Sequence, residues 1–433
     1  MFKLIIIQMG RFTGIIGIIV ILGLAYLWSN NRKAINIRLV ITGLLLQICL
    51  AIFILKVPVG QDIFAFLGKG INKLLDFSQQ GGEFVFGDLT KIGLALPEGI
   101  VKSGVFLFVL LPTIIFVCVL VAMAYHVGLM QRIVALIARF VHWAMRVSGS
   151  EALSNVASAF VGQVEAQIMI RPYLSGMTRS ELLASMTGSM ACIAGGVMAV
   201  YISMGVPASY LLAASLMAAP GALVISKIVF PETEVSETKG KVTLEVKKEH
   251  SNIMDAIAHG ASDGMRISIN VIAMLIGVIA LIALIDALLG YLGHFLAWTG
   301  LSLDAIGINL DHLRLKDIFG ALFSLFAIVM GVPPSESLSV GSLMGTKMVI
   351  NEFVAYSDLS PMIVQGALSA KSVIIASFAL CGFANFSSVA IQLGGIGAIA
   401  PTRKADLARL GLKAMLCGTM ASYISASLAG ILL

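Results

Sequence analysis

Long apolar runs are the feature that most constrains this chain. Runs near the ~20 residues that a helix needs to cross a bilayer lie at 12–29, 39–56, 104–125, 182–203, 208–230, 264–293, 372–400 and 411–433. Charged residues make up only 12% of the 433 residues, about half of the ~25% usual for soluble proteins. Since only helices satisfy their own backbone groups in lipid without closing into a barrel, the sequence predicts an all-α polytopic membrane protein. About eight transmembrane helices are expected.

Several protein classes are excluded by composition. The net charge of +6 is typical of cytoplasmic loops that carry an excess of Lys and Arg. Because no dense basic run with interleaved aromatics is present, nucleic-acid binding is not expected. The five cysteines lie in apolar stretches without CxxC spacing, which indicates neither disulfides nor zinc. The N-terminus lacks a small-residue cleavage site and is interpreted as a first span.

Two apolar segments are interrupted by Gly, Pro and polar residues, at about 150–175 and about 316–356. Irregular backbone at membrane depth is tolerated only where protein or a water-filled cavity covers it. A matched pair of broken segments therefore predicts two re-entrant hairpins at a transporter binding site, although two kinked helices would give the same pattern. Residues 57–101 and 131–147 are amphipathic and are predicted to be interfacial helices.

Basic residues set the expected topology. They cluster at 30–38, 131–146, 171–179, 227–248 and 401–413. If all these clusters are cytoplasmic, both termini lie outside and the two broken segments enter from opposite sides. Opposed entry is what an inverted repeat predicts.

Polar side chains at the breaks are the candidate binding residues. Gln163 and Glu165 follow the first break, and intramembrane acids mark substrate or ion pathways; a Glu paired to a lysine between helices is the alternative. Glu336 follows Pro333 and Pro334 among serines, a set suited to a polyhydroxylated ligand. A third span is interrupted by Phe383, Asn385 and Ser388.

Enzymatic function is not indicated. No Ser–His or Cys–His pair, GxxxxGKS or HExxH motif is legible. No ATP-binding domain is present either, so pumping would have to use an ion gradient.

The residues GTKMVINEFVAY at 345–356 resemble the signature of the concentrative nucleoside transporters, in which Lys347, Asn351 and Glu352 occupy fixed positions. GQVEAQ at 162–167 and CGFANFSS at 381–388 resemble two further stretches of that family. The resemblance runs from about residue 12 to the C-terminus and is highly specific.

This resemblance implies a homotrimer in which an elevator-like transport domain moves across a scaffold. It implies that Gln163 and Glu165 bind the nucleobase, and that Glu336, Asn385 and Ser388 bind ribose. Val197 and Phe383 are implied to pack on the base. The implied divisions are scaffold and interfacial helices (1–130), a first transport repeat (131–230), a cytoplasmic polar loop (231–262), a scaffold helix (263–300) and a second transport repeat (314–433).

Three departures from the family pattern bear on substrate and ion. Val164 stands where the family usually has Thr, which loses a hydroxyl at the base site, and Gln167 replaces a Pro. The implied sodium site consists of side chains at Ser158 and Cys192, where the family has Asn and Ser, with carbonyls of Val161 and Ile193. Because sodium prefers oxygen to a thiol, proton coupling through Glu336 or Glu165 is favoured over sodium.

The sequence therefore predicts a cation-coupled symporter, driven by H+ or Na+, that imports nucleosides across the cytoplasmic membrane without a further cofactor. Its expected partners are the nucleoside, the lipid bilayer and further copies of the chain. The alternatives are a cation-coupled transporter of another small polar solute and a passive channel.

Overall fold

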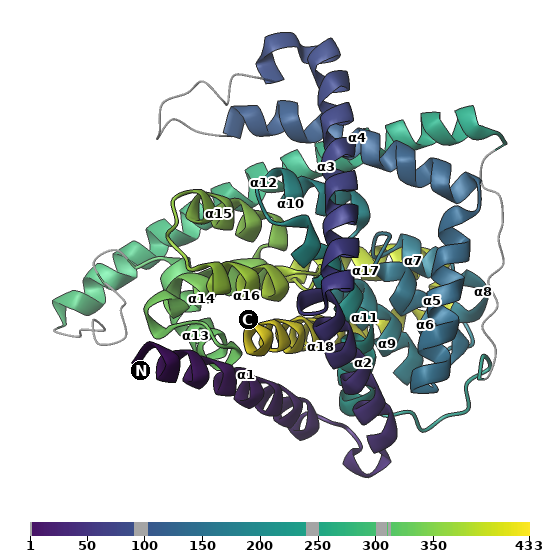
Figure 1. Ribbon diagram of the computed structural model, residues 1–433, viewed down its shortest axis with the longest axis horizontal. Helices are drawn as coiled ribbons and strands as arrows, with labels where there is room; N and C mark the ends of the chain where they lie inside the picture. Colours follow the sequence, from purple (N-terminus) through teal and green to yellow (C-terminus); the bar gives the residue numbers. More distant parts are fainter. Residues whose placement is uncertain (1, 91–102, 240–250, 300–309, 311–312) are drawn as a thin grey trace.

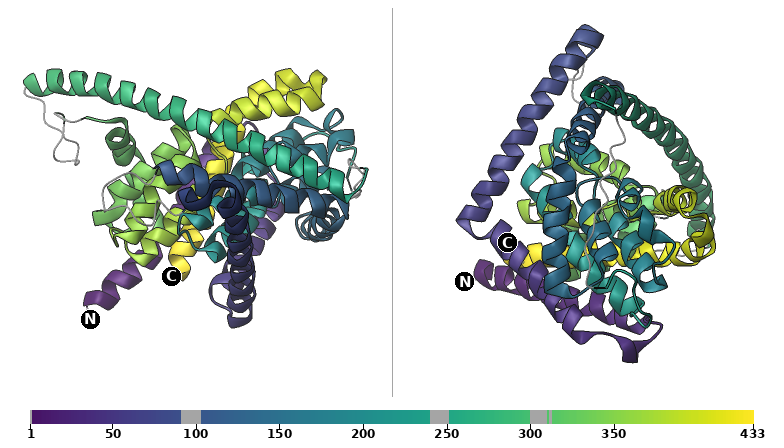
Figure 2. Two further views of the ribbon diagram at one scale, coloured as in Figure 1. Left: turned by 90° about the horizontal axis from the view of Figure 1, so that it is seen from above. Right: turned by 90° about the vertical axis from the view of Figure 1, so that its right-hand side faces the viewer.

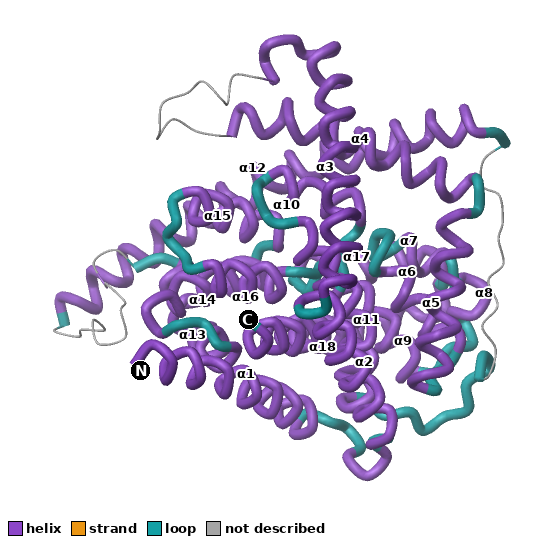
Figure 3. Tube along the Cα trace, in the orientation of Figure 1, coloured by secondary structure: helices purple, strands orange, loops and turns teal. Residues whose placement is uncertain are grey.

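The computed structural model describes residues 2–90, 103–239, 251–299, 310 and 313–433, and these contain helices and loops but no strand (Figure 3). The first half consists of α1 (Phe2–Leu27), η1 (Arg32–Ala34), α2 (Ile37–Leu55), α3 (Pro58–Phe86), η2 (Gly87–Thr90), α4 (Ser103–His126), α5 (Leu129–Met145), α6 (Gly149–Ser158), α7 (Glu165–Ile168), α8 (Arg171–Leu174), α9 (Arg179–Ala191), α10 (Gly195–Ser203) and α11 (Ala208–Val229). The second half consists of α12 (Ile253–Trp298), α13 (Leu315–Met330), α14 (Pro334–Val349), α15 (Glu352–Val364), α16 (Ala370–Leu380), α17 (Phe386–Ile399), η6 (Pro401–Arg403) and α18 (Lys404–Leu432).

Membrane-type helices match the predicted apolar runs. Among the described residues, five helices are long and apolar enough to span a membrane, or seven if two bent pairs each count as one span. The bent pairs are α4 with α5, at 75°, and α13 with α14, at 118°. The runs 182–203 and 372–400 are each divided into two half-helices, α9/α10 and α16/α17. An interruption was expected from the sequence only in the second run, at 383–388.

The centre of the bundle is formed by α11 and α18, which pack against each other (Figure 1). In their most apolar windows, 89% and 78% of the residues are buried. Both helices are rich in Ala, Gly and Ser, and such small residues let helix backbones approach closely inside a membrane protein. They carry the half-helices on their flanks, since α9 and α16 both pack on α18.

One long helix, α12, runs along a side of the bundle (Figure 2) and packs against α4. Two of its glycines make this contact close: a Cβ at Gly264 would lie 2.5 Å from the Cα of Ile115, and one at Gly260 would lie 2.8 Å from the carbonyl oxygen of Cys118. The outward face of α12 carries many exposed apolar side chains, and α3 has a mixed face on which Phe66 and Phe84 are 74% and 92% exposed beside polar residues such as Asp62 and Lys73. Both faces suit contact with lipid or another subunit.

The same order of elements occurs twice, as the predicted repeat requires. Short helices around a break (α6 to α8) precede a broken helix (α9/α10) and a long buried helix (α11). In the second half, α13 to α15 precede α16/α17 and α18.

The predicted polar loop, residues 231–262, is structured at both ends: its first residues bind the first repeat, and its last residues are part of a helix. Residues 231–239 lie at the base of the first repeat, where Glu232 Oε2 accepts hydrogen bonds from Thr178 Oγ1 (2.8 Å) and Lys227 Nζ (3.1 Å). Lys227 also pairs with Glu151 at 2.7 Å, and both are buried. The loop was expected to extend to residue 262, but α12 already begins at Ile253, with Asn252 as its N-cap. Residues 240–250 lie outside the described part.

The two predicted interfacial helices are present as helices. The segment 57–101 contains α3, a single helix of 29 residues, whereas residues 91–101 lie outside the described part. The segment 131–147 contains most of α5, which buries one face consisting of Gln131, Val134, Ala138, Val141 and Met145. Both helices are amphipathic, as expected for a position in the interface.

Candidate functional site

The two broken helices cross at their breaks. The α9/α10 break includes Cys192, and the α16/α17 break includes Gly382, whose φ is +101°. A Cβ at Gly382 would lie 2.6 Å from the carbonyl carbon of Ala191 and 2.7 Å from the carbonyl oxygen of Met190. Glycine is required here both for the backbone conformation and for the close approach, so the crossing is built into the sequence.

The break of the first hairpin, residues 159–164, is joined to both broken helices. The backbone N–H of Gly195, at the start of α10, donates to the carbonyl of Phe160 (3.2 Å). The amide of Gln163 donates from Nε2 to Ser388 Oγ in α17 (3.4 Å). Gln163 and Ser388, both predicted as binding residues, are therefore brought into contact although they are far apart in sequence.

Asn385 is held by three hydrogen bonds at the start of α17. Its Oδ1 accepts from the backbone N–H of Ser388 (2.8 Å) and from Ser387 Oγ (2.7 Å), which makes it the N-cap. Its Nδ2 donates to Glu352 Oε2 (2.8 Å). An amide nitrogen carries two hydrogens, and one of them is used by Glu352 within the described part of the chain.

Glu352 is the buried carboxylate at this site. Besides the bond from Asn385, its Oε1 accepts from the hydroxyl of Tyr201 in α10 (3.1 Å). The Tyr201 ring stacks on Tyr356 with centroids 4.3 Å apart. Glu352 thus links α15 to both broken helices. Tyr201 was not identified from sequence; the available signal was a phenol at the end of an otherwise apolar half-helix.

The other two signature residues hold the second hairpin in place. The ammonium of Lys347 donates to the carbonyls of Ala379 (3.0 Å) and Cys381 (3.2 Å) at the C-terminal end of α16. A cation is favourable there because the free carbonyls of a helix end carry negative partial charge. Asn351 is the N-cap of α15, since its Oδ1 accepts from the N–H of Val354 (2.9 Å).

The structure does not place Glu336 with the other predicted ribose residues. Glu336 Oε2 accepts from the N–H (3.1 Å) and the hydroxyl (2.9 Å) of Ser369. Ser369 is the N-cap of α16, whereas Asn385 follows its C-terminal end. An 11-residue helix is about 16 Å long, so Glu336 lies roughly one helix length from the crossing. The second hairpin reaches the site with Glu352 instead.

Glu165 lies at the start of α7, exposed, with no hydrogen-bond partner among the described residues. Its carboxylate lies over Gly162, where a Cβ would be 2.7 Å from the carboxyl carbon. Val164 beside it points at α17, because a Cβ at Gly395 would be 2.9 Å from its Cγ1. Glu165 is therefore accessible to a ligand, while Val164 forms part of the contact between hairpin and half-helix.

The predicted base-packing residues Val197 and Phe383 are each partly buried, and each lies in or directly after a break. Val197 is in the first turn of α10, and Phe383 is between α16 and α17. Both elements take part in the crossing, which is consistent with a shared apolar wall.

The predicted cation ligands are buried and engaged in hydrogen bonds. Ser158 Oγ donates to the carbonyl of Ser154 (2.7 Å) and shares a bond with Ser189 Oγ (2.9 Å). Cys192 Sγ donates to the carbonyl of Ser215 (3.5 Å). Val161 and Ile193, the predicted carbonyl donors, are 4% and 0% exposed. Within the described residues, no cluster of three or more His, Cys, Asp or Glu could hold a metal ion.

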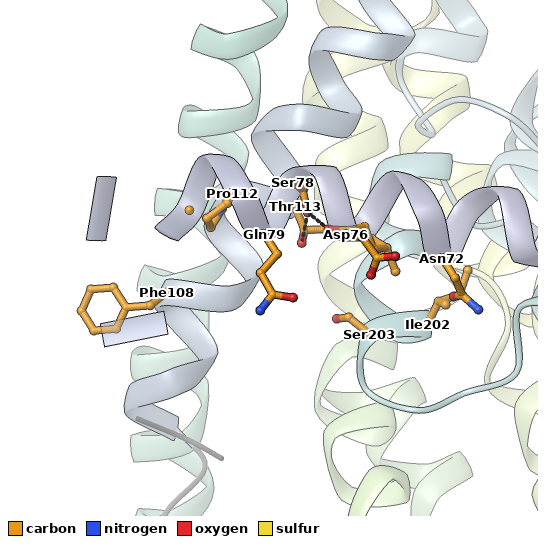
Figure 4. A pocket seen from close by; sticks show the side chains of 11 residues that line it. Asn72, Asp76, Ser78, Gln79, Phe108, Pro112, Thr113, Ile202 and Ser203 are labelled. Carbon is orange, nitrogen blue, oxygen red and sulfur yellow. Dashed lines mark hydrogen bonds between the residues drawn. The ribbon is translucent and has the colours of Figure 1, made fainter. Parts of the chain in front are cut away.

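A separate polar cavity of about 290 Å³ lies between α3, α4 and the end of α10 (Figure 4). Asn72, Asp76 and Gln79 of α3 face Ser203 across it, and Ser78 Oγ bonds to Thr113 Oγ1 at 3.1 Å. None of the predicted site residues lines this cavity, so it is distinct from the crossing.

The crossed broken helices with polar side chains at their breaks define a secondary transporter, and comparison with known proteins gives its family. Residues 16–89 and 210–430 match the models of the Na+ dependent nucleoside transporter N-terminus and C-terminus, and residues 107–208 match a nucleoside recognition model. The chain belongs to the concentrative nucleoside transporter family.

Similar proteins extend over nearly the whole chain. The uncharacterized transporter YutK of Bacillus subtilis is 40% identical over 96% of this chain and 98% of its own length. The nucleoside permease NupC of Helicobacter pylori is 37% identical over 96% of each chain. The structure of CNTnw in an inward-facing substrate-bound state superposes with a TM-score of 0.88 at 40% identity, covering 98% of both chains. This protein is thus a multi-pass membrane transporter and not an enzyme, and bacterial members of the family lie in the inner membrane.

Proposed function

We propose that this protein imports nucleosides together with protons, with the nucleoside bound where the broken helices cross. The observation that carries this proposal is the assembly of Gln163, Glu352, Asn385 and Ser388 by direct hydrogen bonds from three elements, which are the first hairpin break, α15 and the start of α17. Amide, hydroxyl and carboxylate groups can form hydrogen bonds both with the hydroxyls of a sugar and with the polar edge of a nucleobase.

The roles divide between the two halves of the site. Gln163 and Glu165 follow the first break and offer an amide and a free carboxylate to the base. Glu352, Asn385 and Ser388 face them from the second repeat and bind the sugar hydroxyls. In this assignment Glu352 takes the role that the sequence analysis gave to Glu336, because Glu352 contacts Asn385 and Glu336 does not.

A proton is favoured over sodium as the coupling ion because the two predicted side-chain ligands are poorly suited to bind sodium. The Ser158 hydroxyl is already hydrogen-bonded to the Ser154 carbonyl and the Ser189 hydroxyl, and the Cys192 thiol is a poor sodium ligand. Glu165, a carboxylate without a protein partner among the described residues, is the proposed proton carrier. The exposed apolar side chains of α3 and α12 support the further proposal of a homotrimer embedded in lipid.

Uptake of labelled uridine and adenosine into proteoliposomes, with sodium and pH gradients imposed separately, tests the proposal. Accumulation driven only by an inward proton gradient is expected. Accumulation driven by sodium alone would contradict the assigned ion, and equilibration without accumulation would indicate a passive channel. If neither nucleoside enters under either gradient, another small polar solute is the substrate.

Replacing Val164 by Thr should change the ratio of uridine to adenosine uptake by at least about threefold, because a hydroxyl is added beside Gln163 without a change in shape. Competition between the two labelled nucleosides in proteoliposomes measures the ratio. Val389→Thr is the matched control, since Val389 packs against Gly411 of α18, and its ratio should equal that of the unmodified protein. Equal ratios in all three proteins would exclude position 164 from base recognition.

A further inference from the structure

Five polar side chains form a closed cluster beneath the first hairpin. Ser154 and Ser158 lie in α6, Gln167 lies in α7, and Ser185 and Ser189 lie in α9. Each is at most 1% exposed. The set therefore joins both arms of the hairpin to the half-helix behind it, and no role in nucleoside binding accounts for it.

Gln167 is the centre of this cluster. Its Nε2 donates to Ser189 Oγ (2.7 Å) and to Ser154 Oγ (3.1 Å). Its Oε1 accepts from Ser185 Oγ (2.6 Å). Both amide hydrogens and the amide oxygen are thus used by serine hydroxyls, and Nε2 also lies 3.5 Å from the backbone carbonyl of Ser185.

The remaining protons are accounted for by one consistent direction of donation. Ser154 shares a bond with Ser185 (2.6 Å), Ser158 donates to the carbonyl of Ser154 (2.7 Å), and Ser158 shares a bond with Ser189 (2.9 Å). If Ser189 donates to Ser158, Ser158 to the Ser154 carbonyl, Ser154 to Ser185 and Ser185 to Gln167, every hydroxyl proton has an acceptor. The cluster is then neutral and fully satisfied.

We propose that Gln167 is a positioning residue that closes this cluster into a clasp, which holds the hairpin break against α9 without the help of a cation. The inference rests on the proposed nucleoside binding at the crossing. Ser158, the side chain predicted to bind sodium, is a member of the clasp, so sodium could use it only by breaking hydrogen bonds. Nucleoside binding should therefore be independent of sodium.

The side chain at position 167 must supply two donors and one acceptor at once, which glutamine does and an apolar residue does not. An apolar residue would leave three buried serine hydroxyls short of a partner, and the arms of the hairpin would separate from α9. The tip carrying Gln163 and Glu165 lies two to four residues away in sequence, so it would lose its position.

The test is the dissociation constant of uridine and adenosine for the purified full-length protein in NaCl and in choline chloride of equal ionic strength. In the unmodified protein the two salts should give values within about twofold. Gln167→Leu should weaken binding about tenfold or more in both salts, since buried donors and acceptors are left unpaired. Ser189→Ala, a milder change, should give a smaller loss.

Gln47→Leu is the matched control. Gln47 is also fully buried and donates to the carbonyl of Met217 (3.2 Å) and to Ser425 Oγ (2.9 Å), but it joins α2 to α11 and α18. Its loss should lower the melting temperature and leave the dissociation constants within about twofold of the unmodified protein. Binding that is more than about tenfold tighter in NaCl, or unchanged in Gln167→Leu, would overturn the clasp.

Hydrogen exchange of the unliganded protein separates failure of the clasp from failure of the proposed function. Gln167→Leu should accelerate amide exchange in residues 149–174 specifically, Gln47→Leu should not, and sodium should change neither. If the protein binds no nucleoside in any salt, the proposed function fails, and exchange still decides the clasp. Unchanged exchange in Gln167→Leu overturns it.

Discussion

Glu352→Gln should reduce nucleoside uptake by about tenfold to a hundredfold while the protein still reaches the membrane. The carboxylate of Glu352 accepts one hydrogen bond from Tyr201 and one from Asn385. A glutamine has the same shape but only one acceptor oxygen, so its NH₂ group would meet a donor on one side. A buried donor left without an acceptor costs about 1–3 kcal/mol, and each 1.4 kcal/mol is about tenfold in binding. Initial uptake rates in proteoliposomes, normalised to the protein incorporated, measure the loss.

Glu336→Gln is the informative control, because it makes the same change in the same repeat. Glu336 is half-buried and bonds only to Ser369 among the described residues. A glutamine oxygen can accept both of those hydrogen bonds, so uptake should fall by less than about threefold. The opposite result, with Glu336→Gln inactive and Glu352→Gln active, would restore Glu336 as the sugar-binding residue.

The overall class of fold could be predicted because lipid leaves few alternatives. The apolar runs and their interruptions at 150–175, 316–356 and 383–388 determine where helices can continue and where they must break. The repeated order of elements followed from the matched interruptions, whereas the opposed entry that the charge pattern predicts stays a prediction. None of these inferences required knowledge of side-chain contacts.

The identity of the buried carboxylate could not be predicted because two glutamates compete for it. Pro333 and Pro334 form the most visible break in the second segment, and they drew the assignment to Glu336. The chain in fact interrupts that segment twice, once at the prolines and again before Glu352, where Asn351 caps a new helix. Which of the two breaks lies at the crossing depends on how α14 packs along α16, and local sequence patterns do not reveal that packing.

The clasp around Gln167 was also beyond the reach of sequence. Gln167 was visible only as a departure from Pro, and the serines of α6 and α9 are ordinary helix residues in a small-residue-rich chain. Their common function appears only when α6, α7 and α9 are placed together. Ser158 illustrates the same point, since the family resemblance implied a cation ligand, and only the structure reveals its hydrogen bonds with Ser154 and Ser189.

Gly382→Ala should lower the melting temperature strongly and abolish most uptake, because it is the residue at which the two broken helices touch. A Cβ there would lie 2.6 Å from the carbonyl carbon of Ala191, inside van der Waals contact, and the φ of +101° is itself unfavourable for alanine. Strain of this kind costs about 1–3 kcal/mol, and the backbone clash adds to it unless the helices move apart. Moving apart would separate Gln163 from Ser388, so uptake should fall even in the protein that remains folded. Thermal unfolding in detergent and uptake in proteoliposomes should be measured on the same preparations.

Gly394→Ala in α17 is the matched control, since no atom lies within 4 Å of the added carbon and alanine favours a helix by up to about 1 kcal/mol. It should leave uptake unchanged and stability equal or slightly raised. If Gly382→Ala has the same melting temperature and uptake as Gly394→Ala, the breaks do not depend on a glycine contact. The crossing of the two broken helices is then not what holds the binding site together.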